Sequence, residues 1–109
     1  MKTSSSSRDQ LRAVAPKLVE LTEEVVFGDV WERPDLSKRE RSIATVTALI
    51  TSARWDQLNG HLERAANNGV SKAEIFELIT HLAFYAGWPS AMTAASKAKE
   101  FYEKRDAQK

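Results

Sequence analysis

Apolar residues recur at steps of three and four along most of this chain, the spacing that places them on one face of an α-helix. The first such run covers residues 9–26, and Pro16 interrupts it, so we expect a break or kink near Ala15. Its apolar positions are Leu11, Val14, Leu18, Leu21, Val25 and Val26. Residues 26–36 follow with a glycine and a proline, which predicts a turn-rich connector containing one short helical turn.

Two capping boxes mark the starts of two further helices. In each, a serine hydroxyl accepts from the backbone N–H of a glutamate three residues later, and that glutamate reaches back to the serine N–H. Ser37 and Glu40 form the first box, which predicts a helix running through Ala53; its β-branched residues permit a strand, but the cap and the length favour a helix. Ser71 and Glu74 form the second box. The helix that it opens has the apolar positions Ile75, Phe76, Leu78, Ile79, Leu82 and Ala83.

Glycine and proline bound the two remaining helices. One is predicted over residues 55–68, and Gly69 ends it because glycine adopts the left-handed conformation without a Cβ penalty. Its inner face consists of Leu58, Leu62, Ala65 and Ala66. Gly87 then interrupts the chain before a last helix from Pro89 to about Arg105, with the proline in its first turn. Small residues allow this helix to approach its neighbours closely: Ala91, Ala94, Ala95 and Ala98.

These elements predict an all-α protein with no strand. The length of 109 residues suits one domain, so we expect a single helical domain over residues 9–109, preceded by a flexible tail over residues 1–8 that carries four consecutive serines. The formal net charge of +1 argues against nucleic acid or an anionic membrane as a partner. No apolar run approaches the ~20 residues of a membrane span. The N-terminus also lacks the apolar stretch of a signal peptide, so a cytoplasmic location is expected.

The chain contains no cysteine, which excludes disulfides, thiolate metal sites and cysteine-based redox or nucleophilic chemistry. Its two histidines, His61 and His81, fall in different predicted helices. Because histidine exchanges a proton near neutral pH, a facing pair would form an acid–base unit; a hydrogen-bonded structural role is the alternative for each. No carboxylate follows either histidine at three or four residues, so no metal site is expected.

Two arginines, Arg39 and Arg41, lie in the first turn of the helix predicted after Ser37, where the helix dipole disfavours cations. A guanidinium group binds a carboxylate through two parallel hydrogen bonds, so these residues are candidates for an anion-binding role. A solvated basic patch paired with Glu40 explains the same spacing equally well.

Aromatic residues gather in residues 81–90, which hold a histidine, a phenol, an indole and a helix start. Tyr85 and Trp88 either pack a turn between helices or form the wall of a small concave site. Trp31 and Trp55 could each be a core, interface or pocket residue, because their spacing in the sequence does not distinguish these three roles.

Several spaced motifs extend over about residues 20–102. They are Phe27-Gly28-Asp29-Val30-Trp31, Arg33-Pro34-Asp35-Leu36, Arg41-Ser42, the segment from His61 to Gly69, the segment from Glu77 to His81, Tyr85-Ala86-Gly87-Trp88-Pro89, Ala91 and Ala94. In this combination the chain resembles the carboxymuconolactone decarboxylase family of the alkyl-hydroperoxidase-D-like superfamily. The resemblance implies a compact helical fold that assembles into oligomers, commonly homotrimers or homohexamers, with sites near subunit contacts.

The resemblance also bears on the reaction. The peroxidase-like branch of the superfamily carries Cys-x-x-Cys with a histidine four residues later; if His61 is that histidine, Arg54 and Gln57 stand at the cysteine positions. The chain therefore resembles the cysteine-free branch, which includes a decarboxylase that converts 4-carboxymuconolactone without a cofactor. A small carboxylate or lactone substrate and no cofactor are expected on this basis.

For such a reaction, Arg41 would bind a substrate carboxylate and either His61 or His81 would deliver a proton to carbon. Further candidates for substrate binding are Tyr85, Trp88, Trp31 and Arg39. Two alternatives stay open: a small-molecule binding or assembly module that retains the pocket without catalysis, and another cofactor-free enzyme, such as a lactone isomerase or hydrolase. Family membership indicates the fold better than the substrate.

Overall fold

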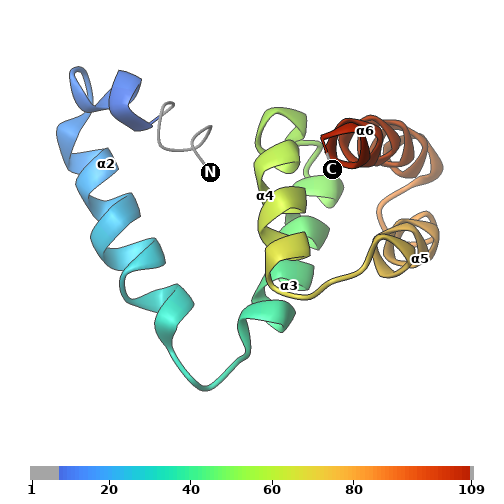
Figure 1. The fold of residues 1–109 in the computed structure, drawn as a ribbon, viewed down its shortest axis with the longest axis horizontal. Coiled ribbons are helices and arrows are strands. Elements are labelled where there is room, and N and C mark those ends of the chain that lie inside the picture. The colour runs from blue at the N-terminus through green and yellow to red at the C-terminus, as the bar shows by residue number, and fades with distance from the viewer. Residues whose placement is uncertain (1–7, 109) are drawn as a thin grey trace. The chain divides into compact units, whose positions relative to one another are not determined.

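A computed structural model describes residues 8–108 of the chain. Within that range the chain consists of helices and turns with no strand, so the predicted all-α class is confirmed (Figure 1). The chain divides into two compact units, Met1–Lys38 and Arg39–Lys109, which are described separately below. Residues 1–7 of the predicted tail lie outside the described residues, whereas Arg8 already belongs to a helix over residues 8–12. The single domain expected over residues 9–109 stays a prediction.

The N-terminal unit contains the predicted break. Helix α2 spans Pro16–Leu21, and Pro16 occupies its first turn, where proline lacks only an N–H that would have no helical partner. A π-helix, η1, continues over Thr22–Phe27. A 3-10 helix, η2, covers Val30–Glu32, which is the short helical turn expected in the connector.

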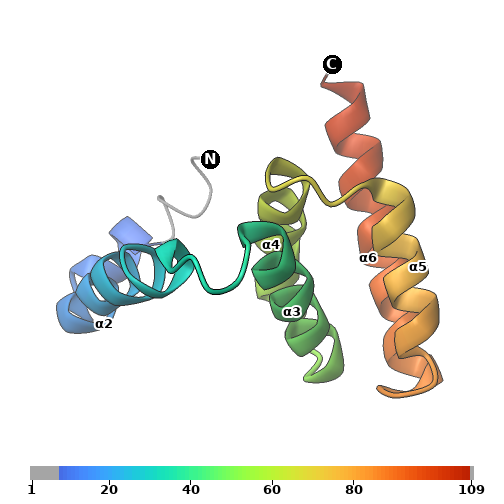
Figure 2. The ribbon, with the colours of Figure 1, turned by 90° about the horizontal axis from the view of Figure 1, so that it is seen from below.

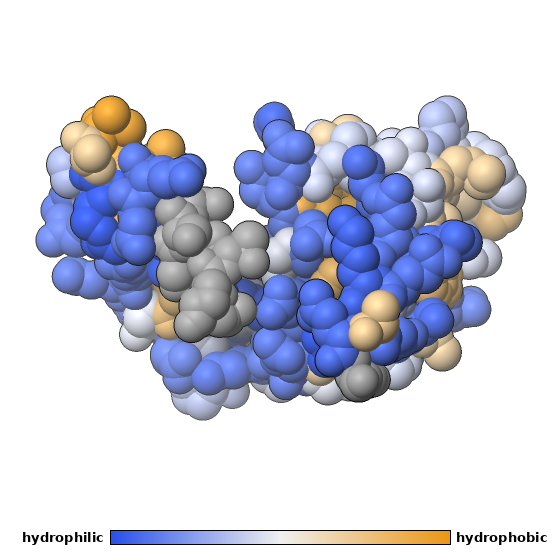
Figure 3. Space-filling model, turned by 45° about the horizontal axis from the view of Figure 1, so that its top comes forward, coloured by the Kyte–Doolittle hydropathy of each residue, from blue (hydrophilic) through white to orange (hydrophobic). Residues whose placement is uncertain are grey.

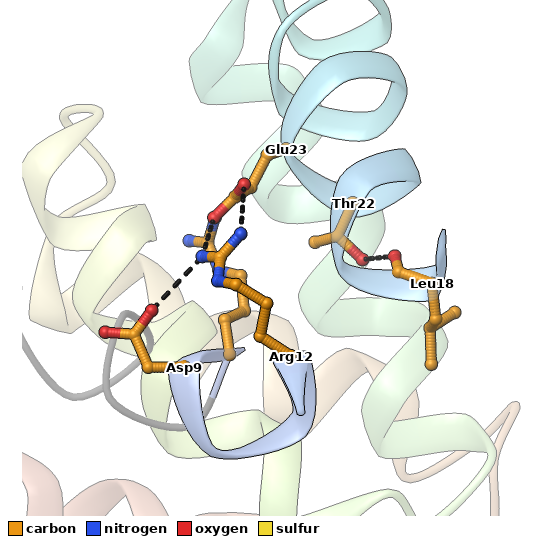
Figure 4. A network of polar contacts seen from close by, with 6 residues as sticks. Asp9, Arg12, Leu18, Thr22 and Glu23 are labelled. Atoms are coloured by element: carbon orange, nitrogen blue, oxygen red, sulfur yellow. Dashed lines mark hydrogen bonds and ion pairs between the residues drawn. The ribbon is translucent and has the colours of Figure 1, made fainter. Parts of the chain in front are cut away.

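Polar contacts hold the π-helix against the preceding helices (Figure 4). The Arg12 guanidinium donates to both carboxylate oxygens of Glu23, at 3.1 and 2.8 Å, and to Asp9 at 3.1 Å. The Thr22 hydroxyl donates to the carbonyl of Leu18 at 2.8 Å. Arg12 thereby lowers the pKa of the Glu23 carboxyl below its ordinary value.

The buried residues of this unit are few. Val19 and Trp31 are buried, the Trp31 ring lies 5.9 Å from that of Phe27, and the Arg8 guanidinium lies 5.3 Å from the Phe27 ring centre. Large apolar side chains of the unit are exposed: Leu11, Val14, Leu18, Leu21, Val25, Val26 and Val30. Figure 3 shows hydrophobic atoms gathered at one end of this unit.

The C-terminal unit is built from four helices. They are α3 (Lys38–Thr51), α4 (Trp55–Asn67), α5 (Lys72–Leu82) and α6 (Trp88–Ala107). Figures 1 and 2 show α3 beside α4 and α5 beside α6. The capping box of Ser71 and Glu74 is present, with the Glu74 N–H donating to the serine hydroxyl at 3.1 Å. Helix α3 begins directly after Ser37, as expected, while the capping box at that end stays a prediction.

The four helices share one apolar core. Leu58, Leu62 and Ala65 of α4 are buried as predicted, and Ile75, Ile79 and Leu82 of α5 belong to the same core. Helix α6 contributes three small residues and two aromatic rings to this core: Ala91, Ala94, Ala98, Phe101 and Tyr102. The alanines allow α6 to lie close to its neighbours, as expected from their spacing.

Two helix ends use the same hydrogen-bond pattern with different residues. After α4, Gly69 adopts φ 93°, and the Val70 N–H donates to the Ala65 carbonyl at 2.9 Å. After α3, Ala53 adopts φ 57°, and the Arg54 N–H donates to the Leu49 carbonyl at 2.8 Å. Both ends are Schellman motifs. The helix predicted to run through Ala53 therefore ends earlier, at Thr51, because Ala53 takes the left-handed conformation that glycine usually supplies.

Candidate functional site

His61 lies in the interior of α4, one residue before the buried Leu62, and its side chain is partly buried. Removal of water from the imidazole lowers the pKa of His61 below its ordinary value, and the nearby positive charge of Arg64 lowers it further. Both causes disfavour the imidazolium form. The neutral form of His61 is therefore favoured, which suits a group that accepts a proton.

His81 lies in the last turn of α5 and is exposed. Its ring centre is 4.9 Å from that of Tyr85, with the ring planes tilted by 33°. The contact follows from local structure, because residues four apart lie on the same side of a helical turn. The structure thus brings these two candidate residues together.

The aromatic segment after α5 lies on the surface of the C-terminal unit. Gly87, at φ 105°, turns the chain into α6, a conformation that strains a residue with a Cβ. Tyr85 is 77% exposed and Trp88 58% exposed, and the Phe84 and Trp88 rings meet edge to face at 5.6 Å. These side chains form an open aromatic surface beside His81 in the C-terminal unit.

The two candidate arginines differ in their surroundings. Arg39 forms an ion pair with Glu74 of α5 and donates from Nε to the Gly69 carbonyl at 3.3 Å. Arg41 lies two residues later in the first turn of α3 and is partly buried. The first arginine is thus tied to the turn that precedes α5, a contact that the sequence pattern did not indicate.

Trp31 belongs to a different compact unit from the other candidates. It belongs to the N-terminal unit, where it is 8% exposed and packs against Phe27. The remaining candidates, Arg39, Arg41, His61, His81, Tyr85 and Trp88, belong to the C-terminal unit.

Sequence reasoning missed two polar residues next to these candidates. Ser42, only 1% exposed, accepts a hydrogen bond from the Asn68 side chain at 3.0 Å. The position of Ser42 on the apolar face of α3 could have indicated a buried hydrogen bond. Its partner could not be predicted, because Asn68 is 26 residues away in the sequence. Arg64 was also missed as a charge acting on His61.

Among residues 8–108, no three side chains of histidine, aspartate or glutamate come together in a way that could hold a metal ion. In the same part of the chain, no helix has both the length and the apolar character needed to cross a membrane.

The fold and these residues define a class of small, all-helical, cysteine-free proteins with a histidine on each of two core helices. A profile of the carboxymuconolactone decarboxylase family matches residues 16–100, a range that contains every candidate residue, and the chain belongs to this family. It is similar to the 4-carboxymuconolactone decarboxylase of Acinetobacter baylyi, with 42% identity over 77 residues, which are 71% of this chain and 58% of that protein.

A second relative is the nitrosuccinic acid decarboxylase npaB of Metarhizium robertsii. It is 41% identical over 75 residues, which are 69% of this chain and 52% of that protein. The chain thus matches little more than half of the length of either relative. The family is established by these similarities.

Proposed function

We propose that this protein is a cofactor-free decarboxylase that acts on a carboxylated lactone such as 4-carboxymuconolactone. The observation that carries the proposal is the similarity, above 40% identity, to two proteins named as decarboxylases of different acids. Both acids carry a carboxyl group together with an electron-withdrawing group, a conjugated lactone or a nitro group. A substrate of this kind needs a carboxylate-binding group and a proton donor, but no cofactor to accept electrons.

The reaction assigned to the site breaks the bond between carbon and the carboxylate group. Carbon dioxide leaves, the bonding electron pair is delocalised into the conjugated lactone, and a proton is delivered to carbon. Arg41 would hold a substrate carboxylate through its planar guanidinium. Tyr85 and Trp88 would shape the apolar wall of the site and reduce its water content. Trp31 and Arg39 stay candidates for substrate binding.

We assign the proton donor to His81 and not to His61. Burial lowers the pKa of His61 below its ordinary value, so the imidazolium form that would donate the proton is disfavoured at this residue. His81 is exposed, and its ring is held against Tyr85 at 4.9 Å. His61 would act as a neutral hydrogen-bonding partner or as the group that accepts a proton in an earlier step.

The test is incubation of the protein with 4-carboxymuconolactone and, separately, with nitrosuccinic acid, with products followed by mass spectrometry and released carbon dioxide measured. His81→Gln and Arg41→Gln are expected to lower kcat/KM by about 100-fold or more, the usual contribution of a positioned acid or a charged contact. Lys97→Gln, on the exposed side of α6, is the matched control and keeps the wild-type rate.

Other outcomes overturn the proposal. Saturable binding of the lactone without a product indicates a binding module. An isomerised or hydrolysed lactone without carbon dioxide indicates another cofactor-free lactone enzyme. Full activity in both folded variants shows that the roles given to His81 and Arg41 are wrong.

We further propose that the protein works as a homotrimer or homohexamer. Four large apolar side chains of the C-terminal unit are exposed in the single chain: Phe84, Tyr85, Trp88 and Met92. Clustered exposed aromatic residues are typical of surfaces that bind another protein. Two of the four are candidate pocket residues, so a neighbouring subunit would complete the wall of the site. The cytoplasmic location and the lack of a nucleic-acid partner stay predictions.

A further inference from the structure

The first turn of α3 is connected to the turn between α4 and α5 by a small polar network, here called the α3 anchor. It consists of Arg39, Ser42, Asn68, Gly69 and Glu74. Arg39 pairs with the Glu74 carboxylate and donates to the Gly69 carbonyl, while the Asn68 side chain donates to the Ser42 hydroxyl at 3.0 Å. The anchor therefore bonds to α3 at Arg39 and Ser42, which are three residues apart on one side of the helix.

The α5 side of the anchor is held in place by the helix cap. The Glu74 carboxylate accepts from the Ser71 backbone N–H at 2.9 Å while it pairs with Arg39. These hydrogen bonds, first that from Ser71 and then that from Arg39, lower the pKa of Glu74 below its ordinary value. The carboxylate thus stays charged at neutral pH and fixed relative to the α5 backbone.

Stabilisation of the fold is a poor explanation for the ion pair. Its side chains are 41% and 48% exposed, and pairs this exposed contribute little to stability. The anchor instead restricts the end of a helix that would otherwise fray, because the first four N–H groups of a helix have no helical partner.

Arg41 is the residue whose direction this restriction controls. It lies between Arg39 and Ser42 in the sequence, and around the helix axis it is rotated by about 200° from Arg39 and about 100° from Ser42. Fixing those two residues fixes the side of α3 from which the Arg41 side chain extends.

We propose that Arg39 is a positioning residue, which through Glu74 holds the first turn of α3 so that Arg41 meets the substrate carboxylate, and that Arg39 does not itself contact the substrate. The inference rests on the proposed function, because it concerns the carboxylate bound in that reaction. It replaces the substrate contact considered for Arg39 with an indirect role.

A double-mutant cycle tests this role with Arg39→Gln, Glu74→Gln and the double variant. Glutamine at position 74 retains the capping box, so only the charge of the pair is removed. Each single variant is expected to raise KM by about five-fold with kcat almost unchanged, and the double variant to be no worse than either. Glu103→Gln, which breaks the exposed pair with Lys99 on α6, is the matched control and keeps the wild-type KM.

Direct contact between Arg39 and the substrate gives a different pattern. Arg39→Gln then raises KM, while Glu74→Gln, which leaves Arg39 unpaired, keeps KM at or below the wild-type value. That pattern overturns the proposal, as does an unchanged KM in all three variants. A loss of folding is recognised separately, by comparing the thermal unfolding midpoints of the variants with that of Glu103→Gln.

Hydrogen exchange separates failure of the anchor from failure of the proposed function. The amides of residues 42–45 bond to carbonyls in the first turn of α3. They are expected to exchange about five-fold faster in Glu74→Gln and Arg39→Gln than in Glu103→Gln. If the wild type converts neither acid, the proposed function fails, and faster exchange still supports the anchor; unchanged exchange overturns it.

Discussion

At the scale of single residues, burial changes how readily a histidine takes up a proton. The sequence places His61 and His81 in two similar amphipathic helices. In the structure His61 is partly buried beside a core leucine, whereas His81 is exposed. Desolvation costs the charged imidazolium more than the neutral ring. Burial therefore favours the neutral form of His61.

The lowered pKa of His61 predicts a pH dependence of stability. In the unfolded chain this group regains its ordinary pKa of 6.5, so the unfolded state takes up a proton at a higher pH than the folded state. The contribution of His61 to stability is complete above pH 6.5 and declines as the pH falls from there towards the lower pKa of the folded state. Urea unfolding at several pH values in this window should show a steeper loss of unfolding free energy in the wild type than in His61→Gln. Parallel losses would contradict the assignment.

Gly28 occupies a position where the backbone leaves no room for a Cβ atom. A Cβ at this position would lie 2.8 Å from the carbonyl oxygens of both Glu23 and Glu24, so the backbone that closes η1 would have to move. Gly28→Ala is expected to lower the free energy of unfolding by about 1–3 kcal/mol, the usual cost of overpacking. Gly60→Ala, where a Cβ meets nothing within 4 Å, is the control. It should be neutral or stabilise α4 by up to about 1 kcal/mol in urea unfolding.

At the scale of elements, helix boundaries depend on single residues in the left-handed conformation. Gly69 follows a common pattern at the end of α4, whereas Ala53 adopts φ 57° at the end of α3 without being glycine or asparagine. The surrounding hydrogen bonds enforce this conformation, since the N–H groups of Ala53 and Arg54 both bond back into the last turn.

Exchanging the residue types at these two ends gives opposite expected results. Ala53→Gly relieves the left-handed strain and should raise the unfolding free energy by up to about 1 kcal/mol, reduced by the greater freedom of glycine in the unfolded chain. Gly69→Ala introduces the same strain and should lower it by about 1–2 kcal/mol. Thermal or urea unfolding of the two variants checks both signs; a stabilised Gly69→Ala would contradict the role of this residue as a helix stop.

At the scale of the whole molecule, the exposed aromatic surface of the C-terminal unit predicts self-association. Sedimentation equilibrium should give the mass of a trimer or a hexamer. Phe84, 75% exposed and not a candidate site residue, allows an independent test. Phe84→Asp is expected to shift the population to smaller species, because a charge cannot be buried there without a partner. Lys97→Asp on α6 should leave the mass unchanged, and a monomeric wild type would refute the assembly.

Signals that act over one or two helical turns were sufficient to predict α3 to α6 and the break before α2, but not the end of α3 at Thr51 or the π-helical form of η1. Each of these signals depends only on residues that are close together in the sequence. They are the apolar spacing of three and four, the serine–glutamate cap at Ser71, the helix stop at Gly69 and the break before Pro16. The absence of cysteine and the spaced motifs also pointed correctly to the family, without any knowledge of contacts.

Tertiary packing decided the contacts between residues that are far apart in the sequence. The pair between Arg39 and Glu74 spans 35 residues, and the bond between Asn68 and Ser42 spans 26, so neither follows from any local pattern. The same holds for the partial burial of His61. The helical period is a property of the chain alone, whereas the charge of a histidine and the partner of an arginine depend on which other helices surround them.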